Sequence, residues 1–438
     1  MAVEKPEIEA KGMSWREYQA SLKRKREARK RSWFAFKWAS MFVLALVLAI
    51  GIAFGVTEFY PRFVTERKEK APAVEMLSKA QIRDLMHGQR LWDVAEEPPR
   101  IALEGKTYEL TSTLDLEFQR HMLAELKPEY ARAIAFVAME PQTGKVLTMV
   151  GYHKDPKAGN PCTQVLFPAA SVYKMVTAAA AMDDKNFTPQ TPVRYNGKKH
   201  TLYKSQLKDV DNKYTRHIDL EEAFADSINP VFGKIGVLVG PEALTAKAKA
   251  MGFEQDLGVE CDFTPSQLGK PENNYRTAEI ASGFNRETLI SAMHGAAMAS
   301  AVLNNGVMPQ PYIIASAENQ KNQIVYEGGL TPMGQSMSES SSLGLQKMMV
   351  EAACHGTGRG CFSRRQRGKA LREIVVGGKT GSINNDTDYD IRYDWFVGFA
   401  HDKENEKQLA FAAIVAHEDY IGKKAGDYCK DAIEYYFD

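Results

Sequence analysis

Residues 167–175 read FPAASVYKM, in which Ser171 and Lys174 are three positions apart. The proline and small residues before the serine, and the alanine-rich run after it, place Ser171 near the start of a predicted helix. Side chains three positions apart lie on one helix face, so the lysine amine can reach the serine hydroxyl. A serine hydroxyl becomes an effective nucleophile when an adjacent base takes its proton. The spacing therefore predicts a serine nucleophile with a lysine base.

This S-x-x-K pattern is not specific by itself. It occurs again at Ser205 and Lys208, inside a polar segment, where we interpret it as chance. A lysine can act as a base only if burial or a second cation lowers its pKa from about 10.4 toward neutrality. Further motifs are needed to support the assignment.

A second element is ADSINPVFGKIG at 225–236, where Ser227 and Asn229 open a predicted amphipathic helix. An ordinary helix cap followed by a proline explains these residues locally. In a functional interpretation, the Ser227 hydroxyl belongs to a proton relay and the Asn229 amide contacts substrate. The segment alone leaves both interpretations open.

A third element is VVGGKTGSINN at 375–385, which places glycines at the end of a β-branched run. Glycine in a strand marks close approach by a ligand or another segment. In this interpretation Lys379 binds a carboxylate, Thr380 and Ser382 donate hydrogen bonds to it, and Gly381 lets substrate backbone lie alongside. A phosphate-binding loop is excluded, because the first glycine of G-x-x-x-x-G-K-[ST] is missing.

The three motifs follow the order S-x-x-K, S-x-N and K-T-G, the set of penicillin-binding proteins and class A β-lactamases. Over about residues 108–438 the sequence resembles the transpeptidase domain of the penicillin-binding proteins. The resemblance extends to TSTLDLEFQ (111–119), AIAFVAMEPQTGKVLTMVGY (133–152), GTG (356–358) and DWFVGFA (394–400).

This resemblance implies a role for each motif residue. Ser171 is the acylated nucleophile and Lys174 its base, while the N–H groups of Ser171 and Ser382 form an oxyanion hole. The relay and the carboxylate-binding strand are then formed by Ser227, Asn229, Lys379, Thr380, Gly381 and Ser382.

The order of predicted elements indicates an α+β fold. Strand patterns lie on both sides of a helical middle that spans about 171–304, so segments from both ends are expected to share one antiparallel sheet. The family resemblance implies the same architecture, an antiparallel sheet flanked by helices with an all-helical subdomain. The strand patterns are at 133–140, 145–152, 372–378, 395–400 and 409–416.

An uncharged run of twenty residues, WASMFVLALVLAIGIAFGVT, occupies 38–57 and follows the cationic stretch KRKREARKR at 23–31. A helix of that length spans about 30 Å, the thickness of the hydrocarbon core of a bilayer. We predict a single transmembrane helix at 33–57 of the cytoplasmic (inner) membrane. The basic tail, 1–32, is then cytoplasmic. A stem over 58–107 and a transpeptidase domain over 108–438 are expected outside the membrane.

The expected function is that of a peptidoglycan D,D-transpeptidase that acylates Ser171 with D-Ala-D-Ala stem peptides, transfers the acyl group to an amine, and binds β-lactams covalently. The alternatives are a D,D-carboxypeptidase, or a penicillin sensor or scaffold. A β-lactamase is disfavoured, because no E-x-x-L-N-like segment follows Ser227. The predicted stem is too short for a glycosyltransferase domain, so a glycosyltransferase or another wall-synthesis membrane protein is an expected partner.

The net charge and the absence of metal-binding motifs argue against several other functional classes. The net charge of +1 gives no reason to expect nucleic acid. No C-x-x-C occurs, and His417-Glu418 does not extend to H-E-x-x-H, so neither a metal nor another cofactor is expected. Cys354 and Cys361 flank a glycine-rich segment. The sequence leaves open whether the two cysteines form a disulfide or stay as free thiols.

Overall fold

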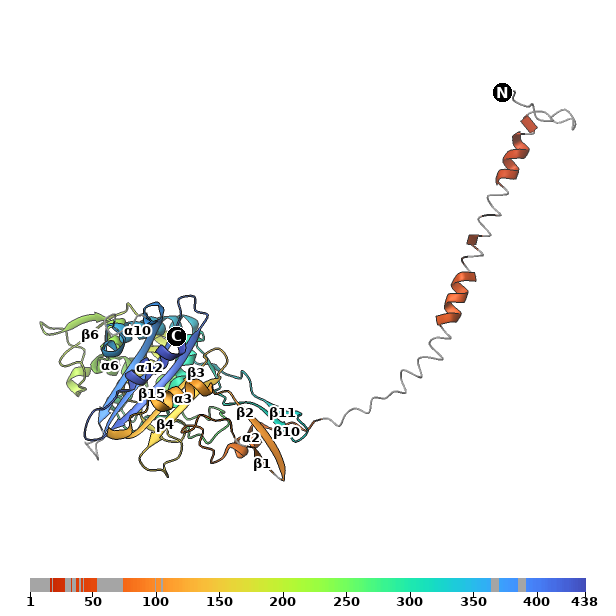
Figure 1. Cartoon of the computed structure of the whole chain (residues 1–438). Coiled ribbons are helices and arrows are strands. Elements are labelled where there is room, and N and C mark those ends of the chain that lie inside the picture. The colour runs from red at the N-terminus through yellow and green to blue at the C-terminus, as the bar shows by residue number, and fades with distance from the viewer. Residues whose placement is uncertain are drawn as a thin grey trace. The chain divides into compact units, whose positions relative to one another are not determined.

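The computed structural model describes residues 74–98, 100–103, 105–363, 370–384 and 391–438, with residues 16–17, 19–27, 33, 37–38, 41 and 43–52 of the N-terminal part. The chain divides into two units, Met1–Val74 and Glu75–Asp438 (Figure 1).

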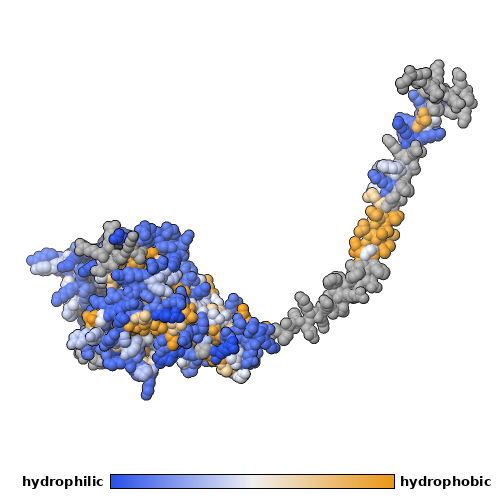
Figure 2. Space-filling model, in the orientation of Figure 1, coloured by the Kyte–Doolittle hydropathy of each residue, from blue (hydrophilic) through white to orange (hydrophobic). Residues whose placement is uncertain are grey.

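Part of the predicted transmembrane segment 33–57 lies outside the described residues. Its described stretch 43–52 is helical, and its apolar side chains are exposed (Figure 2). In the part of the chain that the structure describes, no helix is both long enough and apolar enough to cross a membrane. The membrane anchor therefore stays a prediction.

Five antiparallel strands form the central sheet of the second unit, in the order β13-β14-β15-β3-β4. The first two in sequence are β3 (Ala131–Met139) and β4 (Val146–His153). The C-terminal part adds β13 (Val375–Asn384), β14 (Arg392–His401) and β15 (Gln408–His417). The prediction that segments from both ends share one antiparallel sheet is confirmed, and the fold is α+β.

Helices cover both faces of this sheet. On one face lie α3 (Leu116–Ala124) and α12 (Ala425–Phe437), which pack on β4, β14 and β15 (Figure 1). On the other face, α9 (Ala292–Leu303) crosses β3, β14 and β15. The apolar core under α3 and α12 includes Phe118, Met122, Ile134, Phe136, Phe411, Tyr428 and Ile433. This burial removes both sheet faces from water, which accounts for the near-continuous apolar runs in the strands.

A mainly helical region lies between β4 and the C-terminal strands. It contains α4 (Lys174–Lys185), α5 (Leu220–Ala225), α6 (Asn229–Val239), α7 (Pro241–Ala250) and α8 (Asn274–Ser282), and α10 (Glu339–Cys354) and α11 (Arg359–Phe362) follow later in the chain. The antiparallel ribbon of β6 (Pro192–Tyr195) and β7 (Arg216–Asp219) interrupts it. The predicted subdomain is therefore helical but not all-helical, because the polar segment between α4 and α5 pairs with itself.

A second sheet, in the order β1-β2-β10-β11, was not predicted. Its strands are β1 (Ile101–Leu103), β2 (Lys106–Ser112), β10 (Ile314–Asn319) and β11 (Ile324–Glu327). Helix α2 (Lys79–Met86) buries Ile82, Leu85 and Met86 in the same unit. From Glu75 on, the segment assigned to a stem over 58–107 thus belongs to the folded unit, where the Leu77 N–H donates to the Val325 oxygen and Arg83 pairs with Asp256.

The short elements complete the structure. β5 (Phe167–Pro168) pairs with β8 (Leu289–Ile290), and β9 (Val307–Pro309) pairs with β12 (Pro332–Gln335).

None of the five cysteines, all of which are described, forms a disulfide. The disulfide considered between Cys354 and Cys361 is therefore absent.

Candidate active site

Ser171 lies in the short helix η2 (Ala170–Tyr173), directly before α4. The preceding residue, Ala170, has a φ of +47°, a conformation that favours glycine. Gly283, at the end of α8, packs against this turn, and a Cβ there would lie 1.8 Å from the Ala170 carbonyl oxygen. The missing side chain at Gly283 therefore allows the close contact with the turn that carries Ser171.

Lys174 is fully buried at the start of α4. Its Nζ lies 2.8 Å from Ser171 Oγ, 2.7 Å from Asn229 Oδ1 and 2.5 Å from the Ser282 carbonyl oxygen. Burial, with a smaller effect of the Lys379 charge, holds the pKa of Lys174 well below its ordinary value. A neutral amine has two N–H groups and one lone pair. If Asn229 and Ser282 accept both hydrogens, the lone pair points to Ser171.

Lys379 is the second buried amine, on β13. Its Nζ lies 3.0 Å from Ser227 Oγ and 3.0 Å from the Thr380 carbonyl oxygen. Burial lowers the pKa of Lys379 to about 7. Ser227 has a φ of +56°, a strained value for serine. The structure therefore joins the second and third motifs by a direct contact.

Strand β13 is the edge of the central sheet, with β14 as its neighbour. A Cβ on Gly381 would lie 3.2 Å from the Ala169 oxygen and 3.2 Å from the Val172 side chain. Glycine at position 381 therefore lets β13 approach the turn that carries Ser171. Thr380 Oγ1 donates to Thr357 Oγ1 at 2.6 Å, and Ser382 Oγ lies 3.4 Å from Asp394 Oδ1.

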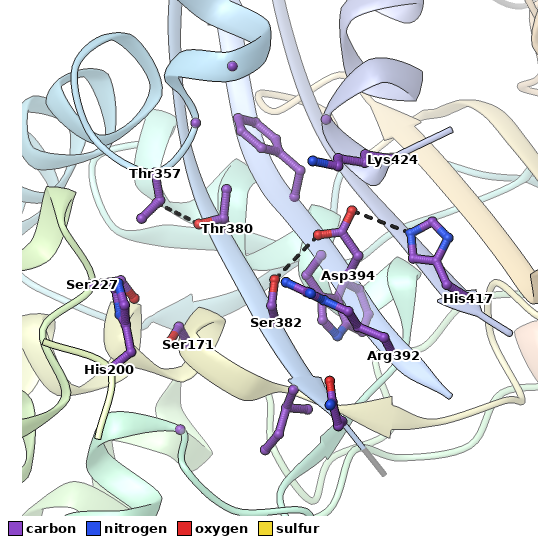
Figure 3. Close-up of a pocket in the computed structure, with 18 of the residues that line it drawn as sticks. Ser171, His200, Ser227, Thr357, Thr380, Ser382, Arg392, Asp394, His417 and Lys424 are labelled. Carbon is purple, nitrogen blue, oxygen red and sulfur yellow. Dashed lines mark hydrogen bonds and ion pairs between the residues drawn. The ribbon is translucent and has the colours of Figure 1, made fainter. Parts of the chain in front are cut away.

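A cavity of about 910 Å³ joins these residues (Figure 3). Of the predicted residues, Ser171, Ser227, Asn229, Thr380 and Ser382 line it, while Lys174 and Lys379 are buried beside it through the contacts given above. The sequence analysis placed eight residues in one site, and the structure brings them together.

Other cavity-lining residues were missed as site residues. They include His200, Phe284, Arg286, Thr357, Arg392, Asp394, His417, Lys424 and Asp427. Thr357 and Asp394 lie inside GTG and DWFVGFA, so the resemblance contained a signal for them. His417 was considered only as part of a zinc motif. Among the described residues, no cluster of three His, Cys, Asp or Glu side chains could hold a metal ion.

The fold and the site define a class of α+β proteins with a serine and two buried lysines at the edge of an antiparallel sheet. The family description "Penicillin binding protein transpeptidase domain" matches residues 134–434. The chain belongs to this family.

Two curated relatives share about a quarter of their residues with this chain over the aligned region. Stage V sporulation protein D of Bacillus subtilis (strain 168) is 26% identical over 323 residues, which cover 67% of this chain and 47% of that protein. The peptidoglycan D,D-transpeptidase PbpA of Mycolicibacterium smegmatis is 23% identical over 313 residues, 64% of this chain and 61% of the relative. The chain thus spans about half to three fifths of the length of these relatives.

Solved structures share the fold. The crystal structure of PBPA from Mycobacterium tuberculosis has a TM-score of 0.61 at 19% identity, over 76% of this chain and 83% of that one. Penicillin-binding protein 3 of M. tuberculosis, complexed with aztreonam, has a TM-score of 0.62 at 17% identity, over 76% and 80%.

Proposed function

We propose that this chain is a serine-type peptidoglycan D,D-transpeptidase that forms an acyl-enzyme at Ser171 and is acylated by β-lactams. The contact of Lys174 with Ser171 carries this proposal, because a buried amine of lowered pKa is placed to take the hydroxyl proton. The family membership and the relatives named as D,D-transpeptidases support it.

In the acylation step, Ser171 Oγ attacks the carbonyl carbon of the penultimate D-Ala while Lys174 accepts the proton. The N–H groups of Ser171 and Ser382 would stabilise the negative oxygen of the tetrahedral intermediate. The C–N bond then breaks, and the proton passes to the departing D-Ala amine. In the second step an amine acceptor attacks the ester, and Ser171 regains its proton.

The substrate C-terminal carboxylate is expected at Thr380 and Ser382, beside Lys379. A charged Lys379 would lower the energy of this carboxylate in a site partly shielded from water. The Lys379–Ser227 contact supports a relay in which Ser227 passes the proton toward the leaving amine. Asn229 holds Lys174 through its Oδ1, and its Nδ2 donates to the His200 carbonyl oxygen at 3.0 Å.

We also propose that the chain is anchored in the cytoplasmic membrane with the catalytic domain outside. The uncharged run at 38–57 and the cationic stretch at 23–31 support this topology. A glycosyltransferase or another wall-synthesis membrane protein is the proposed partner.

The test is turnover of a pentapeptide ending in D-Ala-D-Ala with an amine acceptor present. The proposal predicts release of D-Ala and formation of the acceptor amide, both absent in Ser171→Ala. Release of D-Ala with hydrolysis alone would indicate a D,D-carboxypeptidase. No turnover by wild-type protein that still binds penicillin would indicate a sensor or scaffold.

A further inference from the structure

The active-site cavity does not end at Ser382. Its lining also includes Asp394 on β14 and His417 on β15, which lie beyond Ser382 of the edge strand β13 (Figure 3). The pairing register places Ser382 opposite Asp394, so both side chains lie on the sheet face that α12 covers. The proposed chemistry at Ser171 uses no group at this end of the cavity.

His417 is the unusual residue at this end. It is only 2% exposed, yet neither ring nitrogen has a hydrogen-bond partner in the part of the chain that the structure describes. Its Nε2 lies 3.8 Å from Asp394 Oδ2, which is too long for a hydrogen bond. Only an ion-pair contact at that distance joins the two groups if the imidazole is protonated (Figure 3). Buried polar groups are normally hydrogen-bonded, so an imidazole that makes no hydrogen bond in a cavity wall has both ring nitrogens available to a ligand.

Asp394 is held in place beside it. Its Oδ2 accepts the Ala425 N–H at the start of α12 at 3.0 Å, and its Oδ1 lies 3.4 Å from Ser382 Oγ. A single nitrogen that carries two or more hydrogens can lie about 2.9 Å from both Nε2 and Oδ2 across this gap. An ammonium or a primary amide has this chemistry.

We propose that Asp394 and His417 form a subsite for the amine-acceptor peptide and receive N–H donors from it. This inference rests on the proposed function. An acceptor amine must attack from the place that the departing D-Ala leaves, beside Thr380 and Ser382, and the cavity leads from there to Asp394 and His417. Arg392 and Lys424 line the same end, so a carboxylate on the acceptor would also meet cations.

The test measures how one acyl-enzyme divides between aminolysis and hydrolysis. A thioester analogue of the stem-peptide end serves as donor, with two acceptors: D-alanine, which fills only the place of the leaving group, and a stem tripeptide with a free side-chain amine. Because both products come from the same acyl-enzyme, their ratio does not depend on the acylation rate. The variants are His417→Phe and Asp394→Asn, and the second keeps the test available should the first fail to fold.

In both variants the aminolysis-to-hydrolysis ratio should fall relative to wild type, and it should fall roughly tenfold further with the tripeptide acceptor than with D-alanine. A tenfold change is expected for the loss of one buried hydrogen bond. His401→Phe is the matched control, because His401 lies at the other end of β14 and outside the cavity. Wild-type aminolysis with equal ratios in both variants and wild type would overturn the subsite and leave the proposed function standing. Hydrolysis alone by the wild type would overturn the proposed function, and the subsite with it.

Discussion

Lys174 Nζ lies 2.8 Å from Ser171 Oγ, although the lysine side chain is fully buried. Burial penalises the charged amine, and the neighbouring Lys379 charge adds to that penalty. The two effects favour the neutral form of Lys174, which alone can accept a proton.

Lys174→Met should slow the acylation of Ser171 by penicillin by about 10²–10⁴-fold, because the general base is lost while a side chain of similar length remains. Stopped-flow or gel-based kinetics with a fluorescent penicillin measure the rate, and circular dichroism checks the fold. The control is Lys185→Met, at the exposed end of the same helix. An acylation rate equal to that of the control would refute the role of Lys174.

The acylation rate constant with a carboxylate-bearing β-lactam should depend on pH in a bell shape. It rises as Lys174 loses its proton, at a pH well below the ordinary pKa of lysine. It falls as Lys379, whose pKa is about 7, loses the charge that binds the carboxylate. In Lys379→Arg the falling limb should disappear, because an arginine stays protonated throughout. The same falling limb in Lys379→Arg, with Lys185→Arg as control, would contradict this assignment.

Gly283→Ala should disturb the nucleophile turn. The added Cβ would meet the Ala170 carbonyl oxygen at a φ of +70°, so the turn must shift. We expect a loss of more than about 1 kcal/mol of stability and acylation slowed roughly 100-fold, the cost of about 1 Å of misplacement. Thermal unfolding and penicillin kinetics measure the two effects. Gly329→Ala, where no atom lies within 4 Å, is the control; equal effects at both positions would rule out this contact as the cause.

The sequence predicted which residues lie together in the candidate site better than it predicted the residues around them. Ser171 and Lys174 are joined by helical spacing, so their contact follows from local structure. The contact of Lys379 with Ser227 spans 152 residues, and only the family resemblance pointed to it. The pairing of β2 with β10 was not predicted: Tyr108 and Leu110 alternate with exposed residues in β2, but nothing local in the sequence names β10, about 200 residues away, as the partner strand. Asp394 lies in the DWFVGFA segment, but His417 belongs to no motif of the resemblance, and the two side chains meet through the pairing of β14 with β15.

The penicillin adduct should persist for minutes to hours; a rate of one per hour corresponds to a barrier of roughly 22 kcal/mol. Among the described residues, the carboxylates that line the cavity are Asp394 and Asp427, both beyond Ser382 on the α12 side. Neither is placed beside Ser171 to activate water. Intact-protein mass spectrometry after removal of the drug measures the lifetime.

A lifetime of seconds with catalytic drug turnover would contradict this expectation and indicate a β-lactamase. His200 would then be the candidate base, since it lines the cavity and burial lowers its pKa. A longer lifetime in His200→Gln would assign it.

The most direct test of the account is the site of acylation. The protein is incubated with penicillin and digested, and the modified peptide is sequenced by mass spectrometry, with Ser171→Ala in parallel. The account predicts one penicilloyl group per chain on Ser171 and no adduct in the variant. An adduct on another residue, or Ser171→Ala labelled as well as wild type, would contradict it.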